Sequence, residues 1–208
     1  MAPRHYNLGQ RAEARGQTRQ RIVEATVTLH ARKGAAATTY ADVAAAANVA
    51  VPTVYNHFPT RAELLAGCTS HVMASAPFPD DDLFLHAATL RDRIRIAATS
   101  LFALYEYLEP WLSWSIRELA QVPELLPLEE QRREFREALV RRAFEPRFGK
   151  RVPPAVFATA SALLDFPAWL TLSAHTGKKN AARVASEALA AVSMQYKPRA
   201  GARKENAK

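Results

Sequence analysis

The chain has 208 residues, of which 49% are hydrophobic and only 7 are glycine, a balance that favours a compact, helix-rich globular protein of one or two domains. Its formal net charge of +8 arises at the two ends, since residues 1–75 hold 8 basic against 4 acidic side chains and residues 197–208 hold 5 against 1. A basic terminal region favours a polyanionic partner, nucleic acid before a membrane surface, although a solvated basic surface would give the same count.

Cysteine content and hydropathy exclude several other classes. Cys68 is the only cysteine, so the chain can form neither an intramolecular disulfide nor a cysteine-based metal site. The N-terminal segment lacks the apolar stretch of a signal peptide, and no run of about eighteen apolar residues occurs. We therefore expect a soluble, cytoplasmic protein with no membrane partner and no metal.

The N-terminal part of the chain predicts an arm followed by two helices. Residues 1–17 are polar and contain glycine, which favours a disordered basic arm. From Thr18, apolar positions recur at spacings of three and four up to Gly34, as in a short amphipathic helix. Thr39 followed by Asp42 predicts a capping box that opens an alanine-rich helix over residues 40–47.

A sharp turn and a second short helix follow. Asn48 tolerates the left-handed backbone that such a turn requires, and helical spacing resumes with Val54 and Phe58 on a new face. If Ala50 is the N-cap, Pro52 is the second helical residue, where its missing N–H costs little.

A proline and a threonine mark the next boundary. Pro59 ends the second short helix, and Thr60 with Glu63 predicts a capping box for a connecting helix that runs to about Ser75. Residues 18–75 therefore predict a helix-turn-helix domain with a connecting helix.

Residues 76–196 predict a second, helical domain. An acidic, proline-containing linker leads to a helix capped by Thr89 and Asp92. Further helices are expected over residues 90–108, 111–119 after Pro110, 128–144, 153–175 with a kink at Pro167, and 178–196, followed by a basic disordered tail over 197–208. No strand pattern occurs, so the predicted fold class is all-α with about nine helices.

The second helix of a helix-turn-helix lies in the DNA major groove, with its first residues at base edges. We expect Thr53 and Asn56 to contact bases, Tyr55 and His57 to contact the backbone, and Arg61 to hold a phosphate. On an anonymous helix, Tyr55 and His57 would more often be a packed aromatic residue and a surface histidine.

The order of residues over the whole helix-turn-helix is a more specific indication of function than the individual side chains of its second helix. The stretch "TTYADVAAAANVAVPTVYNHFPTRAELL" resembles the DNA-binding domain of the TetR family of bacterial transcription regulators, and "TRQRIVEATVTLHARKG" looks like the first helix of that domain. The positions in register are Thr39, Val43, Ala44, Ala47, Val49, Thr53, Val54, Tyr55, His57, Phe58 and Leu64. The chain departs from the family pattern at Asn48 for glycine, Ala50 for a capping serine, His30 for phenylalanine and Arg61 for lysine.

The resemblance implies a DNA-binding transcriptional repressor without a cofactor. The DNA-binding residues that it implies are Thr39, Tyr40, Val51, Pro52, Thr53, Tyr55, Asn56, His57 and Arg61. It further implies that the C-terminal domain binds a small-molecule effector and forms a homodimer, which we place on residues 153–175 and 178–196, and that the dimer reads a palindromic operator in double-stranded DNA. An ordinary buried helix is the alternative for residues 153–175.

Aromatic side chains of the second domain are the predicted effector lining, with two polar residues to orient a ligand. The predicted residues are His71, Phe102, Tyr105, Trp111, Trp114, Arg117, Phe135, Phe166 and Trp169. They favour a largely apolar effector, although each aromatic residue taken alone is more often core, and Arg117 more often forms a salt bridge.

Two rival functions differ in class. A helical-bundle enzyme is disfavoured because the chain offers no Glu-x-x-His pair, no glycine-rich phosphate loop and no recognisable nucleophile with its base. An architectural DNA-binding protein that does not switch would bind all sequences equally, and a footprint on one palindrome would exclude it.

Overall fold

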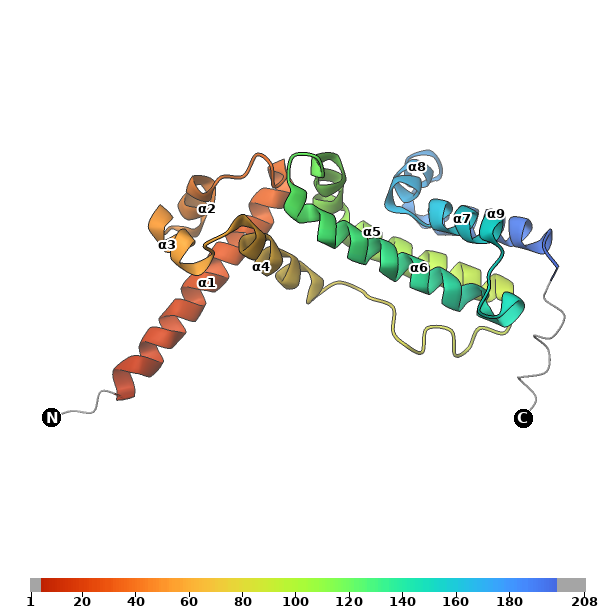
Figure 1. Ribbon diagram of the computed structural model, residues 1–208, viewed down its shortest axis with the longest axis horizontal. Coiled ribbons are helices and arrows are strands. Elements are labelled where there is room, and N and C mark those ends of the chain that lie inside the picture. The colour runs from red at the N-terminus through yellow and green to blue at the C-terminus, as the bar shows by residue number, and fades with distance from the viewer. Residues whose placement is uncertain (1–4, 198–208) are drawn as a thin grey trace. The chain divides into compact units, whose positions relative to one another are not determined.

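The protein is all-α. The computed structural model describes residues 5–197, with side chains from Gly9 onward, and this range contains nine α-helices, one short 3-10 helix and no strand (Figure 1). The helices are α1 His5–Lys33, α2 Tyr40–Ala47, α3 Val51–His57, α4 Arg61–Met73, α5 Leu90–Glu118, the 3-10 helix η1 Pro123–Leu125, α6 Leu126–Phe148, α7 Pro154–Leu163, α8 Phe166–Thr176 and α9 Lys178–Met194. The predicted fold class and number of helices are confirmed.

The chain folds into two compact units. Unit 1 comprises Met1–Ala76 together with Pro110–Leu128, and unit 2 comprises Pro77–Glu109 together with Glu129–Lys208. The boundary between residues 76 and 77 lies at the start of the acidic, proline-containing segment. Residues 110–128 group with the helix-turn-helix, whereas the sequence predicts an effector-binding domain over residues 76–196.

The core of unit 1 holds α1 to α4 together. Ile22 and Val23 of α1 pack with Val43 of α2, Val54 of α3 and Leu64 of α4, all of them at most 4% exposed. Ala44 and Ala47 lie in the same core, and their small side chains let α2 pack closely. This core fixes the two short helices of the turn against α1.

Helix α1 is longer than the sequence predicted. The prediction of a disordered arm is wrong from His5 to Gln17, because α1 begins at His5, while residues 1–4 lie outside the described range. The segment is rich in Arg, Gln, Glu and Ala, which are good helix formers, and each of its two glycines costs a helix only about 1 kcal/mol. Basic side chains in this segment are therefore held on a helix.

Proline positions account for two further differences. Pro110 was expected to begin a new helix, but α5 continues through it from Leu90 to Glu118, so the chain forgoes one helical hydrogen bond there. The predicted kink at Pro167 is replaced by a break between α7 and α8, which are bent by 60°. Asp165 caps the second of these helices, and Pro167 lies in its first turn, where a proline is tolerated.

Unit 2 packs α9 against α8 and α7. Small residues of α9, among them Ala181, Ala185 and Ala190, are buried. Within residues 5–197 no single helix is long and apolar enough to cross a membrane; only α7 and α8, taken together as a bent pair, reach that length and composition. The expected basic tail lies outside the described residues beyond Lys197.

Candidate nucleic-acid interface

The start of α2 is fixed by the predicted capping box. The Thr39 hydroxyl oxygen accepts a hydrogen bond from Asp42 N at 3.1 Å, and Asp42 Oδ2 accepts one from Thr39 N at 2.9 Å. Lys33 Nζ donates to the same carboxylate oxygen at 2.8 Å. Hydrogen bonds from Lys33 first and Thr39 next hold the pKa of Asp42 well below its usual range. The ion pair between Lys33 and Asp42 therefore connects the start of α2 to the end of α1.

The turn itself has the predicted backbone. Asn48 lies in the left-handed region with φ 53° and ψ 54°, and the N–H of Val49 donates to Ala44 O at 2.9 Å. Ala50 is the extended N-cap of α3, makes no side-chain cap and places Pro52 at the second helical position. These expectations are confirmed, and α3 therefore begins at Val51.

Two tyrosines join α2 to α3. The rings of Tyr40 and Tyr55 are stacked, with centroids 4.4 Å apart and planes inclined by 14°. The Tyr40 hydroxyl donates to Phe58 O at 3.0 Å, and burial, followed by the proximity of Tyr55, raises the pKa of Tyr40. Tyr40, which the resemblance assigned to DNA, thus also holds the recognition helix, while Tyr55 is 50% exposed.

The outer face of α3 differs in detail from the expected reading surface. Val54 and Phe58 are buried, as predicted. At 100° per residue, Val51, Pro52, Tyr55 and Asn56 occupy one arc of the helix, and all four are exposed. The other two predicted DNA contacts, Thr53 and His57, are half-buried and lie together at one edge of this arc. The structure therefore centres the exposed face on Pro52, Tyr55 and Asn56, which we call the reading face.

Arg61 makes a contact within the protein. Its guanidinium donates to Ala35 O in the connection between α1 and α2, and the side chain is half-buried. Burial, followed by the charge of Arg61, lowers the pKa of the buried His30 to about 4. The resemblance assigned Arg61 to phosphate, whereas this hydrogen bond ties α4 to the end of α1.

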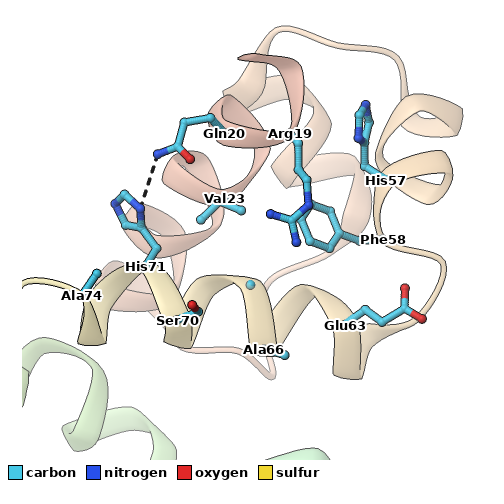
Figure 2. A pocket seen from close by; sticks show the side chains of 11 residues that line it. Arg19, Gln20, Val23, His57, Phe58, Glu63, Ala66, Ser70, His71 and Ala74 are labelled. Atoms are coloured by element: carbon cyan, nitrogen blue, oxygen red, sulfur yellow. Dashed lines mark hydrogen bonds between the residues drawn. The ribbon is translucent and has the colours of Figure 1, made fainter. Parts of the chain in front are cut away.

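A groove of about 620 Å³ runs between α1 and α4 (Figure 2). His57 and Phe58 bound one end, where the Arg19 guanidinium lies 4.7 Å from the centre of the Phe58 ring. Burial, then Arg15 and Arg19, lower the pKa of His57. Gly67 is required beneath the ring, because a Cβ there would lie 2.9 Å from Phe58 Cε1.

His71 lines the far part of the same groove. Its Nδ1 lies 3.4 Å from Gln20 Nε2, so this pair links α4 to α1, as Figure 2 shows. His71 belongs to the connecting helix of the predicted helix-turn-helix domain and was expected to help orient an effector. The structure places it in unit 1.

Three more predicted effector residues also belong to unit 1. The indole N–H groups of Trp111 and Trp114 donate to Val27 O at 3.0 Å and Ala31 O at 3.2 Å on α1. Arg117 is exposed, with its guanidinium 4.8 Å from the centre of the Trp114 ring. One turn further along α5 than Trp114, the carboxylate of Glu118 accepts a hydrogen bond from Ala35 N at 2.8 Å. Hydrogen bonds at successive turns thus hold the end of α5 against α1 and the residues that follow α1.

Most of the remaining predicted effector residues form a packed aromatic cluster in unit 2. Phe102, Tyr105, Phe166 and Trp169 are each at most 4% exposed, and the Tyr105 ring lies 5.6 Å from Phe166 and 6.3 Å from Trp169. The Tyr105 hydroxyl donates to Leu164 O at 3.0 Å, and burial raises its pKa to about 12. Phe135 is separate, edge-on to Phe78 at 5.5 Å.

A partly buried cluster of charged side chains, which the sequence did not predict, also lies in unit 2. Arg132 and Arg136 each donate to Asp165 Oδ1 at 2.6 Å, and the same oxygen caps α8 by accepting from Phe166 N. Arg136 is 6% exposed, and its Nε is buried with no hydrogen-bond partner among the described residues. Asp165 before an aromatic-proline pair was an available N-cap signal, but no sequence pattern pairs it with arginines some thirty positions earlier.

Metal binding has no support in the described part of the chain, where no group of three or more His, Cys, Asp or Glu side chains could hold an ion.

Known proteins with similar sequences match part of the chain. A sequence profile of the bacterial regulatory proteins of the tetR family matches residues 22–68. The HTH-type transcriptional regulator LuxR of Vibrio harveyi is 33% identical over 104 residues, which are 47% of this chain and 49% of that protein. The chain thus matches about half the length of this relative.

The fold resembles that of a solved structure over most of the chain. The multidrug binding protein EbrR, crystallised with imidazole, aligns with a TM-score of 0.53 and 23% identity, covering 84% of this chain and 88% of that one. At this identity the likeness concerns the fold alone. Similarity to the bacterial regulatory proteins of the tetR family is thus established over the helix-turn-helix, residues 22–68.

Proposed function

We propose that the protein is a sequence-specific DNA-binding transcription regulator whose reading face enters the major groove. The observation that carries this proposal is the rigid mounting of α3. The capping box of α2, the left-handed Asn48 and the stack of Tyr40 on Tyr55 fix the helix, while its outer side chains stay exposed. Asn56 can pair with adenine through two hydrogen bonds, and Tyr55 has a hydroxyl for a flanking phosphate.

The proposed active form is a homodimer on a palindromic site. Such a dimer presents two recognition helices roughly 34 to 36 Å apart, one turn of DNA. We place the dimer contact on α8 and α9, where Leu170 is 36% exposed and Met194 65% exposed on helices that pack together within unit 2. Apolar side chains of this kind favour self-association of a helical pair. A cytoplasmic location follows from the DNA partner.

The proposed effector is a small, largely apolar molecule that binds unit 2 and releases the repressor from DNA. Arg136 interacts with Tyr105 of the aromatic cluster, and its buried Nε has no hydrogen-bond partner among the described residues, which supports an effector with one hydrogen-bond acceptor. Release requires that the effector lower the affinity for the operator, and the operator then lowers the affinity for the effector by the same factor. Helix α4, which leads from the helix-turn-helix into the linker, is the proposed connecting element.

A footprint on the DNA upstream of its own gene tests the proposal. We expect protection of one near-palindromic site at a salt concentration at which a scrambled duplex is not protected. Uniform protection would instead identify a non-switching architectural DNA-binding protein. A separate experiment tests the switch by screening small apolar molecules for loss of this protection, which would show that the protein has left the DNA. The same molecules are added to DNA with heat-unfolded protein, to control for their direct effect on DNA cleavage.

A further inference from the structure

Two arginines of α1 lie beside the end of the recognition helix. Arg15 and Arg19 are one turn apart, and both act electrostatically on His57, the last residue of α3. In the described part of the chain neither arginine has an ion-pair partner, whereas Arg61 donates to a backbone carbonyl. The cations available at this edge of the domain are therefore those of α1.

The position of one arginine is fixed by packing. The Arg19 guanidinium lies over the Phe58 ring at 4.7 Å, and Figure 2 shows it pointing toward that ring beside His57. A cation held on an aromatic face loses little side-chain entropy when it meets an anion. The Arg19 guanidinium is thus preorganised to bind an anion at the edge of the reading face.

His57 is surrounded by more positive than negative charge. Arg15 and Arg19 approach it from α1, and Glu63 of α4 is the one carboxylate among the groove-lining residues. Burial, followed by the charges of Arg15 and Arg19, lowers the pKa of His57, so this environment favours the neutral imidazole in the free protein.

From this arrangement we infer that Arg15, Arg19 and His57 bind a backbone phosphate of duplex DNA, and that His57 takes up a proton when the phosphate arrives. The inference rests on the proposed function. A phosphate beside the imidazole favours its charged form and raises its pKa above that of the free protein. DNA affinity therefore rises as pH falls through the interval between these two pKa values, by at most tenfold per pH unit because one proton is involved.

The test is the pH dependence of affinity for a labelled 30-base-pair duplex, measured by fluorescence anisotropy with the full chain between pH 5.5 and 8 at one ionic strength. We expect the wild-type affinity to rise by about threefold or more toward low pH, and the rise to be largely lost in His57→Gln. His71→Gln, at the far part of the groove, is the matched control and should keep the rise. Equal pH dependence in wild type and His57→Gln would overturn the inference, whereas absence of any duplex binding by the wild type would overturn the proposed function.

A direct reading comes from NMR titration of the His57 imidazole, assigned by its loss in His57→Gln. Its pKa should rise when the duplex is added, and an unchanged pKa at saturating duplex would contradict proton uptake. Inorganic phosphate at the same phosphate concentration should shift the pKa less, and an equal shift would show a general anion site instead of a DNA contact.

The arginine contribution is measured by salt dependence. Arg19→Gln should make the plot of log affinity against log salt concentration shallower by about one, the amount for one lost phosphate contact. Arg21→Gln is the matched control, since Arg21 lies two residues away on α1 and donates to Thr18. Equal slopes for the two variants would overturn the role of Arg19.

Discussion

Glu118 occupies the space in which a side chain at Gly34 would lie. A Cβ at Gly34 would be 2.0 Å from Glu118 Oε1, and Gly34 has a φ of +79°. The carboxylate needs this space because Oε2 accepts hydrogen bonds from Ala35 N at 2.8 Å and Ala36 N at 3.1 Å. Thus the end of α5 closes the C-terminus of α1, which itself supports the helix-turn-helix.

Gly34→Ala should destabilise unit 1 by more than its backbone strain alone. A left-handed alanine costs roughly 1 to 2 kcal/mol, and the Cβ must also displace the Glu118 carboxylate. Gly149→Ala is the matched control, since Gly149 has a φ of +64° with open space around its Cβ position. Urea unfolding followed by tryptophan fluorescence and circular dichroism measures both variants, and equal losses would contradict the role given to Glu118.

Glu118→Ala should lower the free energy of unfolding by about 1 to 3 kcal/mol, because it leaves the N–H groups of Ala35 and Ala36 without their side-chain acceptor. Glu118→Gln keeps one acceptor oxygen and should lose less. The same unfolding measurement compares the two, and a larger loss in Glu118→Gln would contradict the hydrogen-bonding account.

Caps on α2 and α3 should respond differently to substitution. Thr39→Ala removes the hydroxyl that accepts from Asp42 N and should cost about 1 kcal/mol. Ala50→Ser should stabilise by less than about 0.5 kcal/mol, because Pro52 has no N–H and Thr53 N already donates to Ala50 O. Thermal unfolding measures both variants. A stabilisation of about 1 kcal/mol in Ala50→Ser, as expected for an ordinary N-cap, would contradict the geometry of this turn.

Tyr55→Phe should preserve stability and weaken DNA binding. The ring keeps its stack on Tyr40, whereas the hydroxyl that we assign to a phosphate is lost. We expect affinity to fall by about fivefold, equivalent to about 1 kcal/mol, equally for the preferred site and a scrambled duplex. A fall confined to the preferred site would assign Tyr55 to base reading instead.

Local sequence rules predicted much of unit 1. The capping box at Thr39, the left-handed Asn48, the start of α3 after Ala50 and the burial of Val54 and Phe58 depend on residues near one another in the chain. Short-range hydrogen bonds and helical periodicity decide such features, so they are readable without a structure.

Long-range partners could not be predicted in the same way. Trp111 and Trp114 were expected to line a ligand site, but their partners are carbonyl groups more than eighty residues earlier. Pro110 reads as a helix boundary, yet α5 continues through it and carries these tryptophans onto α1. Residues 5–17 read as an arm because their basic, polar composition resembles that of a disordered segment, although their helix propensity is good.

The reading face of α3 is proposed to recognise a DNA sequence. The most direct test compares two duplexes, one selected from random sequences for binding and one with the scrambled sequence. The affinity of wild type and of Asn56→Ala is measured for each duplex. Wild type should prefer the selected duplex, and Asn56→Ala should lose about 1 to 3 kcal/mol of that preference, the contribution of one paired base contact, while binding the scrambled duplex as before. Equal wild-type affinity for the two duplexes would contradict the account.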